Sequence, residues 1–366
     1  MQTILAIFRE IHDPRDFNAR HDVAAMLFLA LAATLCGAKS SVGIADFAEA
    51  NEEELAKIVD LPHGAPSHDS FSRLFRLLDP VELAQALTGF AQALRKALGL
   101  DPAKGVVAID GKRLRRGYEK GRSFLPPLMV SVWDAETRLS LATRGTNNGD
   151  EVGASLAALK TLDLKGCIVT GDALHCHPAM ATAVRERGAH YAFKLKANHG
   201  PLFTCAKAAF AAADASGKLQ FFECTNDEHG RHERRRASII ALPDDAPAFP
   251  DLSAIGRIEA ERSISGGKAS NTVHYVVLSK KLPARRLLEV VRGHWSVENE
   301  LHWRLDVVFN EDDARTRKNN APQNLGVLRR MALDILRAHP DTKSVARKMS
   351  LAAWKKEYFY ELFAYW

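Results

Sequence analysis

The chain has 366 residues, of which 46% are hydrophobic and 26% are charged, and its formal net charge is +6. This composition is typical of a folded globular protein and excludes a disordered chain. The length predicts two or three domains of about 100–200 residues each. The five cysteines are odd in number and contain no Cys-x-x-Cys pair. This argues against a disulfide framework or a structural zinc site and fits a reducing cytoplasm.

No segment of the sequence has the character of a membrane span or a signal peptide. The longest uncharged apolar run, Val23 to Cys36, is shorter than the ~20 residues that cross a bilayer, so we expect a buried helix there. The N-terminal segment carries Arg9 and acidic side chains early and lacks a small-residue cleavage site. We therefore expect a cytoplasmic protein with no membrane partner.

Residues 1–100 are expected to form a helical N-terminal domain, because apolar residues recur there at helical spacing. Ser67, directly after Pro66, is the expected N-cap of one of these helices. Two short helices, over Gly43–Asn51 and Ser67–Leu78, fit a helix-turn-helix. A plain helical bundle fits the same pattern equally well, so both interpretations stay open.

The pattern changes at Gly105, where short apolar runs begin to alternate with helical stretches. The runs predict strands over residues 106–109, 128–133, 139–144, 167–170 and 191–196. With helices over 151–162 and 178–187 between them, they predict an α/β domain on a mixed sheet over residues 105–338. A polar, strand-like stretch at about 219–280 predicts a β-rich insertion. Residues 339–366 are expected to form a C-terminal helical tail.

Two of the predicted strands end in an acid, Asp110 and Asp172. An aspartate after an apolar strand is more often a turn or capping residue. If the two strands are neighbours, however, the carboxylates lie close together, and a third acid on a helix could complete a metal site. Carboxylate oxygens suit Mg²⁺ or Mn²⁺. Two such ions about 3.5–4 Å apart relieve the repulsion between the acids and support an in-line phosphoryl displacement.

Zinc is a weaker alternative. His294, Glu298 and His302 fall at i, i+4 and i+8 on one helix face, but the chain has no His-Glu-x-x-His motif. The adjacent residues 175–177, His-Cys-His, cannot all face one ion comfortably.

Three segments around the acids are long and specific. They are residues 107–112 (VAIDGK), 171–176 (GDALHC) and 294–307 (HWSVENELHWRLDV). Together with matches along nearly the whole chain, they resemble the ISAs-type insertion-sequence transposases, the group that includes the H-repeat-associated proteins linked to Rhs elements. The further matches are residues 13–15, 66–67, Phe71, 147–151, 194–198, 229–231, 310–312, Arg315, Arg317, 324–325 and 329–330.

The resemblance implies an RNase H-like catalytic core with a DDE active site. Asp110 then takes the first acidic position, Asp172 the second and Glu298 the third. The three acids are then expected to bind two Mg²⁺ or Mn²⁺ ions as the cofactor. The alternatives for the third position are Glu300, Asp306 and Glu311. Related transposases place Tyr, Arg and Lys around the third acid, where this chain has Val291, His294 and Leu305.

The implied activity is that of a bacterial DNA transposase acting on chromosomal or plasmid DNA. It binds the terminal inverted repeats of its element through the N-terminal helices, cleaves the ends and transfers the strands to target DNA. Because two ends must be held together, a homo-oligomer is expected on DNA. Two alternatives stay open: a catalytically decayed or repurposed DNA-binding protein, and a metal-dependent nuclease that cuts without joining.

Basic and amide side chains near the acids are the expected DNA contacts, since Lys and Arg neutralise phosphates. They are Lys112, Arg113, Arg115, Arg116, Lys194, Lys196, Asn198 and Arg231. A solvated surface is the alternative for each group, including the arginine run at 231–236. We expect Trp295 and Trp303 to be core anchors rather than base-stacking residues.

Overall fold

The computed structural model describes residues 1–100, 105–119, 121, 125–228, 231–264 and 270–364. The chain forms two compact units, each assembled from separate segments. The first consists of Met1–Pro102, Gly111–Leu162 and Glu298–Trp366, and the second of Ala103–Asp110 and Asp163–Val297.

The first unit opens with helices, as the apolar periodicity predicts. They are α1 (Gln2–Arg9), α2 (Val23–Leu35), α3 (Ser41–Ala50), α4 (Glu52–Leu55), α5 (His68–Leu77) and α6 (Pro80–Ala97). All 13 residues of α2 are buried, which confirms the buried helix expected from the longest apolar run. The Ser67 hydroxyl accepts a hydrogen bond from the Ser70 backbone N–H and caps α5, as predicted. Helices α3 and α5 are in contact, and the helix-turn-helix interpretation stays a prediction.

The rest of the first unit packs around one long helix. Strand β2 (Leu128–Asp134) pairs antiparallel with β3 (Leu139–Thr146), and α7 (Glu151–Leu159) packs on both. Helix α12 (Ala321–Ala338) is buried from Ala321 to Leu336 and contacts α2, α5, α6 and β3. The remaining elements are α11 (Trp303–Val307), η3 (Glu311–Asp313), α13 (Val345–Trp354) and α14 (Lys356–Glu361).

The second unit contains the longer run of strands. These strands are β1 (Val106–Arg113), β4 (Ile168–Gly171), β5 (His190–Leu195), β6 (Phe221–Glu228), β7 (Arg231–Ala241), β8 (Ala254–Ile264) and β9 (Ser270–Leu278). Their order in the sheet is β1-β4-β5-β9-β8-β7-β6. Strand β1 passes from one unit into the other, so the strand order of the first unit is β3-β2-β1. Strands β1, β4 and β5 are parallel, and β9 runs antiparallel to β5.

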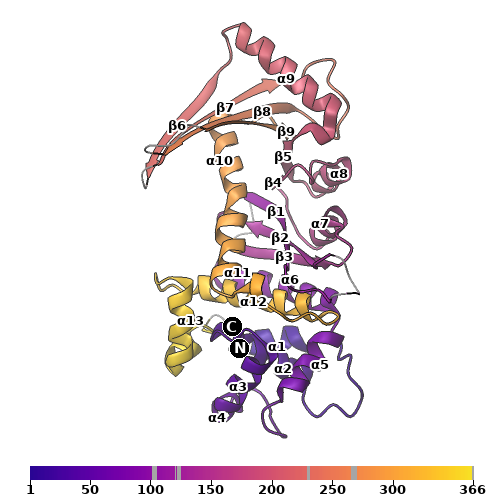
Figure 1. Ribbon diagram of the computed structural model, residues 1–366, viewed down its shortest axis with the longest axis vertical. Helices are drawn as coiled ribbons and strands as arrows, with labels where there is room; N and C mark the ends of the chain where they lie inside the picture. The colour runs from indigo at the N-terminus through magenta and orange to yellow at the C-terminus, as the bar shows by residue number, and fades with distance from the viewer. Residues whose placement is uncertain (101–104, 120, 122–124, 229–230, 265–269, 365–366) are drawn as a thin grey trace. The chain divides into compact units, whose positions relative to one another are not determined.

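Helices α9 (Gly200–Ala215) and α10 (Ala284–Ser296) cover opposite faces of the strands β6–β9 (Figure 1). Successive residues of β8 show this, because side chains alternate across a strand. A Cβ on Gly256 would lie 2.5 Å from the Leu287 side chain of α10. The next residue, Arg257, instead donates to Asp214 of α9 at 2.7 Å. The unit also contains α8 (Pro178–Glu186) and η1 (Ala197–His199).

Helices and nine strands in the described residues make a mixed α/β fold, which confirms the predicted α/β class. The RNase H-like core stays a prediction. No helix within the described ranges is long and apolar enough to cross a membrane. All five cysteines lie within the described residues, and none of them forms a disulfide.

Candidate active site

The register of β1 and β4 places two of the predicted acids at the same end of the second unit's sheet. Ala108 pairs with Thr170 in this parallel ladder. Asp110 comes two residues after Ala108, within β1, and Asp172 comes two residues after Thr170, directly after the end of β4. Neighbouring strands lie about 4.8 Å apart. Each acid is therefore two residues past the last paired residue of two adjacent parallel strands.

Asp172 is oriented by the turn that follows it. Its Oδ1 accepts hydrogen bonds from the backbone N–H of Leu174 at 2.9 Å and from Nδ1 of His175 at 2.8 Å. Burial raises the pKa of Asp172, but the hydrogen bonds and the charge of His175 outweigh it and lower the pKa to about 2. The Oδ2 atom makes no hydrogen bond or ion pair within the described residues, and the side chain is 46% exposed. The Asp172 carboxylate is therefore ionised at neutral pH. Its Oδ1 is held by hydrogen bonds, and its Oδ2 is left for a ligand.

His175 is fully buried, and the glycine before Asp172 makes room for it. A Cβ on Gly171 would lie 2.5 Å from the Cβ of His175, closer than real Cβ contacts. Sequence reasoning considered His175 only as a zinc ligand. The signal that could have identified it is its position three residues after the strand-terminal aspartate, within reach of an Asx turn.

Helix α10 lies directly against the two acid-bearing strands. Nδ1 of His294 shares a hydrogen bond of 3.1 Å with the Thr170 hydroxyl of β4. A Cβ on Gly293 would lie 3.1 Å from the Val106 side chain of β1. Burial, then His175 and Lys194, lower the pKa of His294 to about 4, against the opposing effect of Asp172. His294 is therefore neutral at pH 7 and fastens α10 beside Asp172.

The third predicted acid, Glu298, belongs to the first unit and lies in a π-helical segment, η2 (Val297–His302). Single π-helical turns inside longer helices are frequent at functional sites. Glu298 is exposed, and within the described part of the chain its carboxylate has no hydrogen bond or ion pair.

The three alternatives to Glu298 each form an ion pair with a lysine or arginine side chain of the protein. Glu300 binds Arg337 at 3.2 Å. Asp306 binds Lys112 at 2.7 Å, and the fully buried Glu311 binds Arg330 at 3.3 Å. Among the four acids of this segment, the described contacts leave Glu298 as the one free to bind a ligand.

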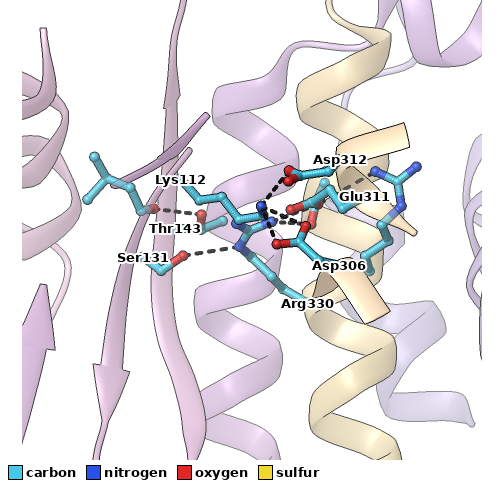
Figure 2. A network of polar contacts seen from close by, with 10 residues as sticks. Lys112, Ser131, Thr143, Asp306, Glu311, Asp312 and Arg330 are labelled. Carbon is cyan, nitrogen blue, oxygen red and sulfur yellow. Dashed lines mark hydrogen bonds and ion pairs between the residues drawn. The ribbon is translucent and has the colours of Figure 1, made fainter. Parts of the chain in front are cut away.

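Figure 2 shows the polar network of the first unit, in which Lys112 Nζ lies between Asp306 and Asp312, 2.7 Å from each. The Lys112 side chain is only 8% exposed. Burial raises the pKa of Asp306, an effect that Asp312 reinforces and Lys112 opposes. Because its charge is shared by two carboxylates, Lys112 is poorly placed for the DNA contact predicted for it, and this arrangement favours a role in holding the segment that carries Asp306.

The other predicted DNA contacts have mixed environments. Arg113, Arg115 and Arg116 are exposed, the latter two in ion pairs with Asp312 and Asp313. Lys196 is exposed and Lys194 half-buried. The Asn198 amide donates to the Ala173 carbonyl at 2.9 Å, which ties it to the turn after Asp172. The side chain of Arg231 lies outside the described residues.

Strand alternation divides the arginine run of β7 between two faces. Arg234 and Arg236 both pair with Glu223, whereas Arg235 pairs with Glu233 at 2.6 Å. The core-anchor prediction for the two tryptophans is wrong, because Trp295 is 37% and Trp303 48% exposed. Helical periodicity alone could not reveal this, because it does not show which face of a helix the neighbouring elements cover.

The donor set fits a divalent cation at the Asp110–Asp172 end of the sheet. Hard cations take carboxylate oxygens. Asp172 presents an ionised, half-buried carboxylate just past β4, and Asp110 follows the paired part of the adjacent strand β1. Within the residues that the structure describes, no three His, Cys, Asp or Glu side chains are grouped as ligands of one ion.

Comparison with known proteins decides the family. Residues 5–91 match the family described as DDE_Tnp_1-associated, and residues 101–335 match the family described as Transposase DDE domain. The chain belongs to the DDE transposase family. The resemblance drawn from the sequence is thereby confirmed.

This DDE transposase family member has relatives that match it along most of their length. It is 30% identical to the H repeat-associated putative transposase YhhI of Escherichia coli (strain K12), over 95% of the chain and 94% of the relative. The putative protein YbfL of the same strain matches with the same identity and coverage. The putative transposase YncI of E. coli O157:H7 is 28% identical over 100% of the chain and 95% of the relative.

Among solved structures, the piggyBac transposase synaptic complex with hairpin DNA is similar at 12% identity and a TM-score of 0.48. It covers 99% of this chain and 78% of that chain.

Proposed function

We propose that this transposase cleaves DNA at the terminal inverted repeats of an insertion sequence and joins the freed 3′ ends to target DNA. Asp110, Asp172 and Glu298 are its DDE acids, carried by an RNase H-like core. The strand order β3-β2-β1 in one unit and β1-β4-β5 in the other supports that core. The observation that supports the proposal is the parallel β1–β4 register, in which Asp110 and Asp172 each come two residues after the paired residues Ala108 and Thr170.

Each residue has a defined task. Asp110 and Asp172 supply carboxylate oxygens for the metal, while His175 and two backbone N–H groups keep Asp172 ionised and oriented. Neutral His294 holds α10 against β4. Bound Mg²⁺ or Mn²⁺ ions would activate the attacking oxygen and stabilise the leaving oxygen of the phosphodiester.

DNA is the partner that the exposed basic side chains suit. Arg113, Arg115 and Arg116 follow the first acid and can neutralise backbone phosphates. Joining two element ends needs both to be held at once, so we propose that the active form on DNA is a homo-oligomer.

Single amide substitutions test the site. Asp110→Asn, Asp172→Asn and Glu298→Gln should each abolish Mg²⁺- or Mn²⁺-dependent cleavage of labelled element ends while DNA binding persists. Glu300→Gln is the matched control, because Glu300 lies two residues on and is paired with Arg337. It should retain cleavage. Cleavage retained by any of the three variants would remove that residue from the site.

The wild-type chain must also be distinguished from its alternatives. End binding without nicking in Mn²⁺ would support a decayed DNA-binding protein. Nicking without strand-transfer products would support a nuclease. Transfer products from the wild type, absent in Asp110→Asn, are the result that the proposal requires.

A further inference from the structure

A groove in the second unit lies between α10 and the strands β7–β9. It has a volume of about 140 Å³. Its helix wall includes Leu288, Val291 and Trp295, which share one face of α10. Across from them, the alternate β8 and β9 residues Ala260 and Thr272 pair in the ladder. Because these two side chains are small, helix and sheet do not close, and the groove remains open.

Trp295 presents its indole ring in this groove. The residue is 37% exposed, and the Arg262 guanidinium lies 5.3 Å from its ring centroid. An accessible aromatic face flanked by arginine is the combination with which proteins bind unpaired nucleotides, by stacking on the base and attracting the phosphates.

The groove is strongly basic. Arg235, Arg262 and Arg292 all line it. Glu233 pairs with Arg235 at 2.6 Å and with Arg262 at 2.5 Å, so one carboxylate is shared by two guanidinium groups. Arg292 is exposed and has no hydrogen bond or ion pair within the described ranges. The positive charge left over suits a ligand that carries phosphates.

A basic side chain of the neighbouring strand β5 lies next to the groove. His274 of β9 is part of the groove wall. Val276, two residues further along β9 and on the same face, pairs with Lys194 of β5. Lys194 and His274 are therefore near one another on this face of the sheet, and the pKa of His274 is lowered by burial and then by Lys194, Lys196 and Arg262.

We propose that this groove binds an unpaired nucleotide of the DNA strand, with its base stacked on Trp295 and its phosphates on Arg262 and Arg292. The proposal rests on the proposed function in taking DNA as the ligand, but it does not depend on cleavage.

The test compares two DNA ligands of the same sequence, a blunt duplex and one with several unpaired nucleotides at its 3′ end. Binding to the full chain is measured in EDTA, so that catalysis plays no part. Trp295→Ala should weaken binding of the DNA with the unpaired end about tenfold and leave the blunt duplex within about twofold. Trp295→Phe, which can still stack, should restore most of the loss.

Two controls isolate the groove. Arg285 lies on the same helix outside the groove and pairs with Glu289. Trp354, 68% exposed, belongs to the first unit. Arg292→Ala should weaken binding of the unpaired end, whereas Arg285→Ala and Trp354→Ala should not.

Three outcomes would overturn the proposal: wild-type affinities for Trp295→Ala, an equal loss for both ligands, or equally tight binding of an abasic unpaired end. Failure of the groove is distinguishable from failure of the proposed function. Asp110→Asn should keep the preference for unpaired ends while losing cleavage. Cleavage by Asp110→Asn would contradict the proposed catalytic acids but would not contradict the proposal that the groove binds an unpaired nucleotide.

Discussion

At the scale of single residues, the orientation of Asp172 depends on His175, whose buried ring lies 2.8 Å from Oδ1. Partners that orient a ligating carboxylate typically contribute about 10–100-fold in metal affinity or activity. We expect His175→Ala to raise the Mg²⁺ concentration for half-maximal cleavage by about that factor. His175→Asn, which can place an amide N–H near the position of Nδ1, should recover part of the loss. A titration of cleavage against Mg²⁺ measures both.

Gly171 offers a second route to the same effect. Gly171→Ala would press on His175 without removing a hydrogen-bonding group, so its Mg²⁺ requirement should rise as well. Gly200→Ala is the control, since a Cβ there meets nothing within 4 Å. An unchanged Mg²⁺ dependence in His175→Ala would show that Asp172 is held adequately by the backbone N–H groups alone.

Sequence alone could single out Asp110 and Asp172 as candidates, because a short apolar run followed by an acid is a local pattern. It could not assign Lys112, two residues beyond Asp110, because its partners Asp306 and Asp312 are far away in the chain. The local sequence of a lysine near an acid is the same whether the lysine contacts DNA or a carboxylate within the protein. Only the fold distinguishes the two environments.

At the scale of elements, Lys112 ties the end of β1 to the segment that follows η2 (Figure 2). Lys112→Met leaves Asp306 and Asp312 adjacent without a counter-ion. Removing one partner of a buried pair is costly, and with carboxylates 32% and 24% exposed we expect about 2–3 kcal/mol of lost unfolding free energy. Urea unfolding of the metal-free chain measures the change.

The matched control is Arg115→Met. Arg115 also pairs with Asp312, but the Arg115 side chain is 75% exposed. Exposed pairs contribute little, so less than about 1 kcal/mol is expected. Adding Asp306→Asn to Lys112→Met should recover stability by relieving the carboxylate repulsion. A double variant less stable than Lys112→Met would contradict the assigned charge balance.

The elements themselves were largely predictable, but their ends and irregularities were not. The apolar run at 106–109 marks only the first half of β1, which continues through Asp110 to Arg113. Likewise β7 begins at Arg231, in a polar run with no apolar signal, because ladder hydrogen bonds to β6 and β8 extend it. The helix expected to carry His294, Glu298 and His302 on one face contains a π-helical segment, Val297–His302, which carries Glu298.

At the scale of the whole molecule, the composition of each unit follows from long-range contacts. Ala103–Asp110 belongs with Asp163–Val297, although Gly111–Leu162 lies between them in the sequence. No local pattern marks such a boundary, because it depends on β1 pairing with β4. The burial of polar side chains in α12 has the same kind of cause, because it depends on contacts with elements that are distant in the sequence.

Asp334 of α12 is one of these groups and should make folding pH-dependent. It is 1% exposed and accepts a hydrogen bond from the Ser140 backbone N–H at 3.2 Å. Burial raises its pKa to about 7, against the opposing effects of Arg337, Ser140 and Arg330. The pKa of this carboxyl in the folded chain is higher than its ordinary value of 3.8 in the unfolded chain. Between these two pH values the folded chain therefore binds more protons than the unfolded chain. This group's contribution to stability is therefore present at low pH and lost as the pH rises towards 7.

In Asp334→Asn this loss of stability with rising pH should be absent, because the amide does not titrate. The amide oxygen can still accept a hydrogen bond from the Ser140 backbone N–H. The unfolding free energy of the variant minus that of the wild type should therefore increase between pH 5 and pH 8, by at most a few kcal/mol at about 1.4 kcal/mol per pKa unit. Urea unfolding at each pH measures the difference, with the exposed Asp60→Asn as a control that should show no such trend. A difference independent of pH would mean that Asp334 stays ionised in the folded chain, held by Arg337 and Arg330 more strongly than burial opposes it.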